Sequence, residues 1–89
     1  MSEKKVFIIL QDNEDARPII EAIEADNPDA VIQRQPGMVR IEAISSLRIN
    51  QSTVEENCGR EWDVQEIHLS LVSLGGNVDE DDDYFSLHW

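Results

Sequence analysis

The chain has 89 residues, of which 19 are acidic and 7 basic, for a formal net charge of −12. That length leaves no room for two cores of ordinary size, so we expect one domain over residues 1–89, and the acidic field argues against nucleic-acid and anionic-membrane partners and favours a basic protein surface. A single cysteine excludes an internal disulfide, and no apolar run approaches the roughly 20 residues of a membrane span or the core of a signal peptide, so we expect a cytoplasmic protein.

The first two elements are predicted as a buried strand and an amphipathic helix. Residues 5–11, "KVFIILQ", are rich in β-branched and aromatic side chains, which favour strands. Between residues 12 and 28 apolar side chains recur at helical spacing with acids on the other side; Pro18 suits the first turn, and Pro28 ends the helix. The apolar positions of this helix are Ala16, Ile19, Ile20 and Ile23.

The next segment predicts a hairpin, a short strand and a second helix. Residues 30–44 form two strand patterns about a Pro36-Gly37 turn, and "LRI" continues as a further strand. Ser52 and Glu55 have the capping-box spacing at the start of the helix, and Gly59 is placed to end it. In the second hairpin strand the predicted core residues are Val39, Ile41 and Ala43, and those facing away are Met38, Arg40 and Glu42.

The last third predicts two more strands around an acidic loop. Residues 64–74 alternate, which places Ile67, Leu69 and Leu71 on a core face. The acids Asp79–Asp83 follow Gly75-Gly76 as a loop, and residues 84–89 alternate again as a final strand that ties the terminus down. The expected fold is α+β, a mainly antiparallel sheet with two or three helices in the order β-α-β-β-β-α-β-β.

Motifs for catalysis or metal binding are scarce. His68 and His88 lack the spacing of a metal site and are more typical of surface positions. Cys58 lies among glutamates, which raise a thiol pKa, so a small structural side chain is the expected role. The acidic run lacks the glycine and glutamate positions of a calcium loop; it is either a solvated connector or a recognition surface. Trp62, beside Arg60, is either a cover of the core or an interface aromatic.

Four segments, in this order and at these spacings, resemble the small effector (coupling or regulatory) proteins of bacterial multicomponent diiron monooxygenases, in particular those of phenol hydroxylase systems. They are "DNEDARPIIEAIEADNPDA", "PGMVRIEA", "VEENCGREWD" and "DEDDDYFSLHW". The resemblance covers nearly the whole chain, and its most specific parts are "PGMVRIEA" and "GREWD".

The resemblance implies a protein without cofactor, metal or catalysis of its own. Such an effector binds the diiron hydroxylase of an aromatic-hydrocarbon monooxygenase near its active site and tunes substrate access, O₂ reactivity and coupling. Turnover also needs a flavin and iron-sulfur reductase. By motif position, the candidate partner-binding residues are Asn57, Arg60 and Trp62. The outward-facing hairpin residues Met38 and Arg40 come next, and Asp81 and Asp82 are added with the acidic run taken as a recognition surface.

Two other classes of function fit the composition. One is a small acidic enzyme, such as an isomerase that uses a carboxylate with His68. The other is an acidic mimic that occupies a basic nucleic-acid site, which high salt and DNA competition would reveal.

Overall fold

The computed structural model describes residues 4–89, which form two antiparallel sheets, two α-helices and one 3₁₀ helix. In chain order the elements are β1 (Lys5–Gln11), α1 (Arg17–Asp26), β2 (Val31–Gln35), β3 (Met38–Ile44), β4 (Ser46–Asn50), α2 (Gln51–Cys58), η1 (Val64–Leu69), β5 (Leu71–Gly75), β6 (Asn77–Glu80) and β7 (Tyr84–His88). The α+β fold and its antiparallel pairing are as predicted.

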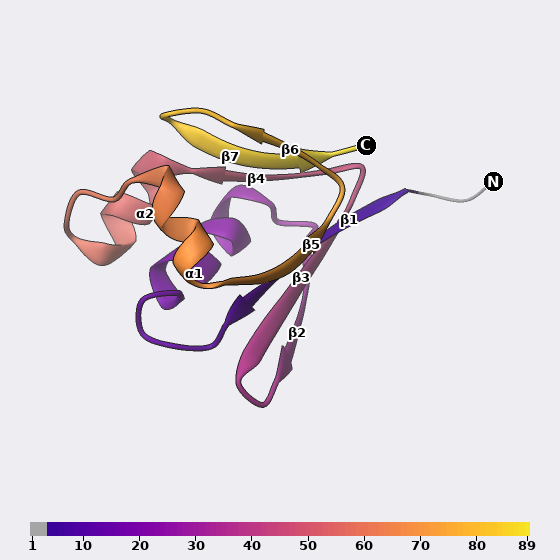
Figure 1. The fold of residues 1–89 in the computed structure, drawn as a ribbon, viewed down its shortest axis with the longest axis horizontal. Coiled ribbons are helices and arrows are strands. Elements are labelled where there is room, and N and C mark those ends of the chain that lie inside the picture. The colour runs from indigo at the N-terminus through magenta and orange to yellow at the C-terminus, as the bar shows by residue number, and fades with distance from the viewer. Residues whose placement is uncertain (1–3) are drawn as a thin grey trace.

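The strands divide between a four-stranded sheet, β2-β3-β1-β5, and a three-stranded sheet, β4-β7-β6. Figure 1 shows the smaller sheet across the top of the molecule, the larger one below it, and the helices filling the space between them at one side. The chain passes between the sheets at two positive-φ residues, Ser45 (φ 71°) and Gly76 (φ 128°). Strand β5, before Gly76, is an edge of the larger sheet, and β6, after Gly76, is an edge of the smaller one.

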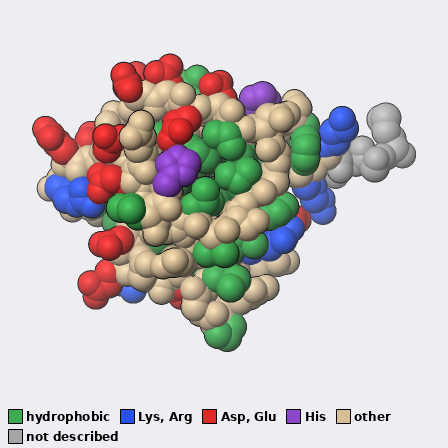
Figure 2. Space-filling model, in the orientation of Figure 1, with side chains coloured by type: hydrophobic (Ala, Val, Ile, Leu, Met, Phe, Trp, Pro, Cys, Tyr) green, Lys and Arg blue, Asp and Glu red, His purple; other side chains and the backbone are tan. Residues whose placement is uncertain are grey.

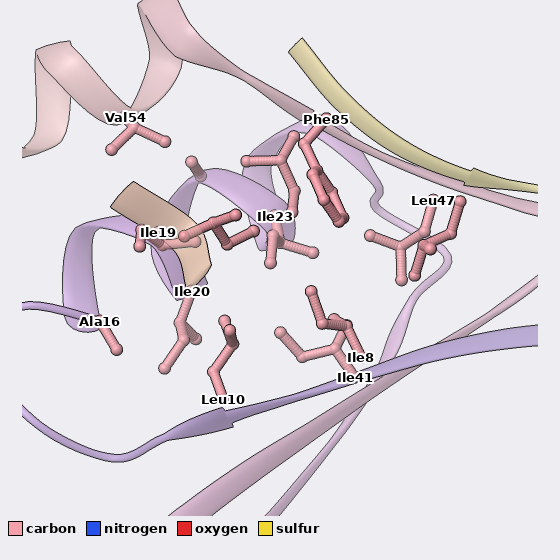
Figure 3. Close-up of a cluster of buried hydrophobic side chains, with 14 of the residues drawn as sticks. Ile8, Leu10, Ala16, Ile19, Ile20, Ile23, Ile41, Leu47, Val54 and Phe85 are labelled. Carbon is pink, nitrogen blue, oxygen red and sulfur yellow. The ribbon is translucent and has the colours of Figure 1, made fainter. Parts of the chain in front are cut away.

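The core lies between the two sheets and is closed at one side by the helices. In Figure 3, Phe85 of β7 points toward Ile23 of α1, while Ile8 and Ile41 approach from the larger sheet. The predicted core positions of α1 and of β3 are all buried, because their spacing matches the period of a helix and of a strand. They are Ala16, Ile19, Ile20, Ile23, Val39, Ile41 and Ala43.

Helix ends agree with the sequence only in part. Pro18 lies in the first turn of α1, and Gly59 ends α2 in the left-handed conformation, as predicted. The capping box predicted at Ser52 and Glu55 is wrong, because α2 begins at Gln51 and no side chain caps it. The Glu55 carboxylate accepts a hydrogen bond from the Trp62 N–H instead, at 2.9 Å.

The largest difference from the predicted fold concerns residues 64–74. They alternate like one strand, yet residues 64–69 form the 3₁₀ helix η1, and β5 begins at Leu71. A capping box starts η1: Asp63 accepts from the first-turn backbone, and Glu66 accepts from the Asp63 N–H at 2.8 Å. The predicted faces are therefore partly reversed, with Leu69 78% exposed and Ser70 only 2%.

The acidic run is not a single loop. Its first half belongs to β6, a strand that the sequence analysis did not predict, and the turn to β7 spans residues 81–83. The final strand is as predicted, with Phe85 and Leu87 buried. Trp89 is half-exposed, but its indole N–H donates to the Lys5 carbonyl at 2.7 Å and ties the chain end to β1.

Candidate protein-binding site

An exposed apolar patch lies between β5 and β6, and we name it the β5–β6 patch. Both strands are sheet edges, so side chains that face the core side of each sheet stay partly open to solvent. Figure 2 shows hydrophobic side chains gathered in the middle of this face beside a histidine, with acidic side chains along its upper and left borders. The patch consists of Leu69, Leu71, Leu74 and Val78; Leu71 and Leu74 oppose the buried Leu10 and Ile8, and Val78 opposes the buried Leu87.

Helix η1 borders the patch and is fastened to β6. His68 Nε2 lies 3.1 Å from Glu80 Oε1, and its ring meets the buried Phe85 ring edge-on at a centroid distance of 6.1 Å. His68 itself is exposed, in agreement with the surface position predicted for it. The pair positions Leu69, the next residue, at the border of the β5–β6 patch.

Trp62 lies in the core, with only 3% of its surface exposed. Its backbone N–H donates to Glu55, and its carbonyl accepts from the Gln51 side chain at 2.8 Å. Of the two interpretations of this residue, the placement favours the core cover. Any effect of Trp62 on a partner must therefore pass through the exposed residues that it holds in place.

Asn57, in the last turn of α2, and Arg60, just after that helix, are both exposed. The Asn57 amide donates to the Pro18 carbonyl at 3.2 Å, and the Arg60 guanidinium donates to the Glu61 carbonyl at 2.7 Å. A cavity of about 110 Å³ is lined by Arg60, Trp62 and Leu69 among others, so the "GREWD" segment continues into the patch. Cys58, half-buried against the core, fits the structural role expected of it.

The acidic turn, Asp81–Asp83, lies at the same end of the molecule. The Asp83 carbonyl accepts from the Gln51 N–H at 2.9 Å, which holds the turn against the start of α2. Asp81 and Asp82 are exposed, and the Asp82 N–H donates to the Asp81 side chain at 2.7 Å. Next to the turn, the hydrogen bond from the Tyr84 hydroxyl to Asp79 raises the pKa of Tyr84, and the charge of Asp79 acts in the same direction.

Met38 and Arg40 lie elsewhere, on the side of the larger sheet that faces away from the core. The Arg40 guanidinium lies over the Phe7 ring, 4.3 Å from its centroid, and donates to Glu42 at 3.0 Å. That hydrogen bond is the main cause of a lowered Glu42 pKa, and the charges of Lys5 and Arg40 add to the effect. The structure thus brings five candidate residues to one end of the molecule and leaves these two on another face.

The described residues also bear on metal and membrane sites. Within residues 4–89 no three His, Cys, Asp or Glu side chains are placed to share a metal ion. An open cavity of about 540 Å³ beside Trp62 is lined by polar and acidic side chains that mostly hydrogen-bond to nearby backbone. No helix in the described part of the chain is long and apolar enough to cross a membrane.

Sequence reasoning missed the β5–β6 patch. The alternation of residues 64–74 predicts Leu69 in the core, and the strand that contains Val78 is not predicted from the sequence. The capping-box spacing of Asp63 and Glu66 was the available signal for η1. The edge positions of β5 and β6 follow from pairings between distant segments, for which the sequence carries no local signal.

Comparisons with known proteins agree over nearly the whole chain. Residues 4–88 match the model of the MmoB/DmpM family. The chain is 57% identical over 84 residues to the phenol 2-monooxygenase stimulatory component DmpM of Pseudomonas sp. (strain CF600), covering 94% of this chain and 93% of that protein. It superposes with a TM-score of 0.92 and 55% identity on a chain in the structure of a phenol hydroxylase–regulatory protein complex, covering 97% and 99% of the two chains.

A more distant likeness concerns the fold alone. The soluble methane monooxygenase regulatory protein B superposes with a TM-score of 0.75 at 19% identity, covering 99% of this chain and 67% of that one. The arrangement of two sheets and helices is therefore shared at low sequence identity.

Proposed function

This chain belongs to the MmoB/DmpM family, and on that premise we propose that it is a non-catalytic regulatory protein of a multicomponent phenol monooxygenase. It binds the diiron hydroxylase near the active site and tunes substrate access, O₂ reactivity and coupling. The observation that carries the proposal is the 55% identity, over nearly the whole of both chains, with a chain from a hydroxylase–regulatory protein complex.

The β5–β6 patch is the proposed centre of the hydroxylase contact. On one side Arg60 lines a cavity together with Leu69, and on the other side His68 is paired with Glu80, the residue before the acidic turn. No Lys or Arg follows Arg60 in the sequence, and acidic side chains line the upper and left borders of the patch (Figure 2). A complementary partner surface is apolar at its centre and carries basic side chains around it.

The candidate residues take different parts in this contact. Arg60 and Asn57 contact the hydroxylase directly, whereas the buried Trp62 holds the segment that presents them. Asp81 and Asp82 are exposed rim charges, which act mainly on the rate of encounter. Met38 and Arg40, on the outward side of the larger sheet, are the next candidates for contact with the hydroxylase.

Regulation of this kind requires a difference in affinity. An effector that binds two hydroxylase conformations equally well shifts nothing between them. A preference of about 1.4 kcal/mol changes the ratio of the two conformations tenfold. The binding free energy of a few exposed side chains is therefore large enough to change turnover.

The remaining features of the proposed system concern its setting. A flavin and iron-sulfur reductase supplies electrons to the hydroxylase, and the complex works in the cytoplasm. The net charge of −12 supports a protein partner over nucleic acid or an anionic membrane surface.

Reconstitution tests the proposal. Purified protein is titrated into hydroxylase and reductase while phenol oxidation and NADH consumption are followed together. We expect oxidation to rise to a plateau at a fixed ratio of effector to hydroxylase, and the protein alone to show no turnover. Absence of stimulation at every ratio, or phenol oxidation by the isolated protein, would overturn the proposed function.

A further inference from the structure

The β5–β6 patch is closed by backbone at one end and by a pair of side chains at the other. Strands β5 and β6 are joined at Gly76, where the chain passes from the larger sheet to the smaller one. At the ends away from Gly76, η1 stops one residue before β5, and Glu80 is the last residue of β6. His68 Nε2, in η1, lies 3.1 Å from Glu80 Oε1. This pair, which we name the His68–Glu80 clasp, therefore bridges the two sheet edges at the end away from their backbone connection.

The clasp supplies a directional contact across this gap. Strands β5 and β6 belong to different sheets and share no ladder of backbone hydrogen bonds. Among the hydrogen bonds of residues 4–89, only that of the clasp joins η1 or β5 to β6. Apolar contact between the edges is non-directional and sets no fixed spacing. The separation of the two edges at this end therefore depends on the clasp.

The smaller sheet presents a preformed site to the His68 ring. Glu80 opposes the buried Phe85 in the β6–β7 ladder, so both side chains lie on the core side of that sheet. The imidazole meets the Phe85 ring edge-on, with an interplanar angle of 78°, while its Nε2 contacts the carboxylate. Only 30% of the Glu80 side chain is exposed, and a carboxylate covered to that extent needs a polar partner. His68 is that partner.

Protonation of His68 turns the clasp from a neutral hydrogen bond into an ion pair. Histidine is the side chain whose charge ordinarily changes between about pH 5 and pH 8. The neutral ring forms one hydrogen bond with the carboxylate, and the imidazolium adds the attraction of opposite charges. Glu66 pairs with Arg60, and Asp79 accepts from the Tyr84 hydroxyl, which leaves the Glu80 carboxylate in contact with the ring. The charged residues on the surrounding elements are Asp15, Arg60, Glu66, Asp79 and Glu80.

We propose that the His68–Glu80 clasp positions the β5–β6 patch for the hydroxylase, and that protonation of His68 tightens it, so that binding strengthens as the pH falls from about 8 to about 6. This inference rests on the proposed function, in which the hydroxylase occupies the patch, and it makes His68 and Glu80 positioning residues. A tight clasp fixes Leu69, on η1, relative to Val78, on β6. A surface that is ordered before binding loses less conformational entropy when the partner arrives.

Amide hydrogen exchange tests the clasp in the protein alone. Exchange rates of η1 and β6, corrected for the intrinsic effect of pH, give their protection against local opening. In the wild type we expect the protection of both elements to be about two- to fivefold higher at about pH 6 than at about pH 8, which is the size expected of a partly exposed ion pair. Glu80→Gln removes the charge but keeps an acceptor, so it should lose this difference. Equal changes with pH in the wild type and in Glu80→Gln would overturn the proposal.

Affinity for the hydroxylase is the second measurement. Calorimetric titrations at about pH 6 and about pH 8 compare the wild type with His68→Gln and Glu80→Gln. The dissociation constant at the higher pH, divided by that at the lower, should be about two- to fivefold larger in the wild type than in either variant, because titration of hydroxylase groups is common to all three. His88→Gln is the matched control: it removes the other of the two histidines, which lies on the outward side of β7, and should keep the wild-type ratio.

The outcomes separate this inference from the proposed function. An equal ratio in the wild type and in His68→Gln overturns the inference, as does an equal loss of the pH effect in His88→Gln. Stimulation of phenol oxidation by the wild-type protein is measured in the same samples. If that stimulation persists while the ratios are equal, the regulatory function stands and the positioning role of the clasp falls. If the wild type binds no hydroxylase at either pH, the proposed function falls and the positioning role falls with it.

Discussion

Replacing Leu69 by alanine is the sharpest test of the β5–β6 patch as the hydroxylase surface. Leu69 ends η1 and is 78% exposed, so its side chain contributes little to the core. Alanine is a good helix former, and a substitution at so exposed a position should change the free energy of unfolding by less than about 0.5 kcal/mol. Affinity and stability therefore respond differently to this change.

The expected loss of affinity follows from the exposed fraction. The substitution removes three carbon atoms, and burial is worth about 0.8 kcal/mol per carbon. Scaled by the 78% that is open in the free protein, the loss is roughly 1.9 kcal/mol, or about 25-fold in the dissociation constant. Isothermal titration calorimetry against the hydroxylase measures it, and urea unfolding checks that stability is retained.

Ile44→Ala is the matched control, because Ile44 is also exposed but lies on the side of the larger sheet that faces away from the core. Its hydroxylase affinity should equal that of the wild type. If Leu69→Ala binds the hydroxylase as tightly as the wild type, or if Ile44→Ala weakens binding as much, the patch is not the hydroxylase contact.

Three further predictions concern the acidic turn, the η1 cap and the Glu42 carboxylate. Replacing the four aspartates of the acidic run by asparagine should slow association with the hydroxylase at low salt more than it speeds dissociation, in stopped-flow measurements; an unchanged association rate would make the turn a solvated connector. The residues changed are Asp79, Asp81, Asp82 and Asp83. Asp63→Ala should cost about 1 kcal/mol in urea unfolding through loss of the η1 cap, whereas Asp63→Asn should retain most of it. Because the pKa of Glu42 is lowered in the fold, its interactions stabilise the protein above pH 4.5, the unfolded value, and this stability is lost as the pH falls through the folded value. In Arg40→Gln, NMR titration should show a higher Glu42 pKa than in the wild type. An unchanged pKa would show that Arg40 is not the cause of the lowering.

The parts of the fold that the sequence predicted are those governed by local pattern. Helix α1 and the β2–β3 hairpin combine a clear period with turn residues at their ends, and every predicted core position in α1 and β3 is buried. Gly37, at φ 79°, supplies the left-handed turn that the Pro36-Gly37 pair indicates. In these segments the tertiary structure and the local preference agree.

The capping boxes show where local pattern is ambiguous. Both Ser52–Glu55 and Asp63–Glu66 have the required spacing, but only the second forms. At the first, the Glu55 carboxylate is taken by the Trp62 backbone, seven residues away. Which of two equal local signals is used thus depends on a tertiary contact that the sequence does not display.

The sequence predicted only part of the candidate site, because the rest of it depends on tertiary structure. The family resemblance pointed to Asn57 and Arg60, and the density of carboxylates pointed to the acidic turn; the structure places both at one end of the molecule. The β5–β6 patch arises because Gly76 sends two consecutive strands into different sheets, each as an edge. No periodicity in residues 71–80 distinguishes an edge strand from a central one.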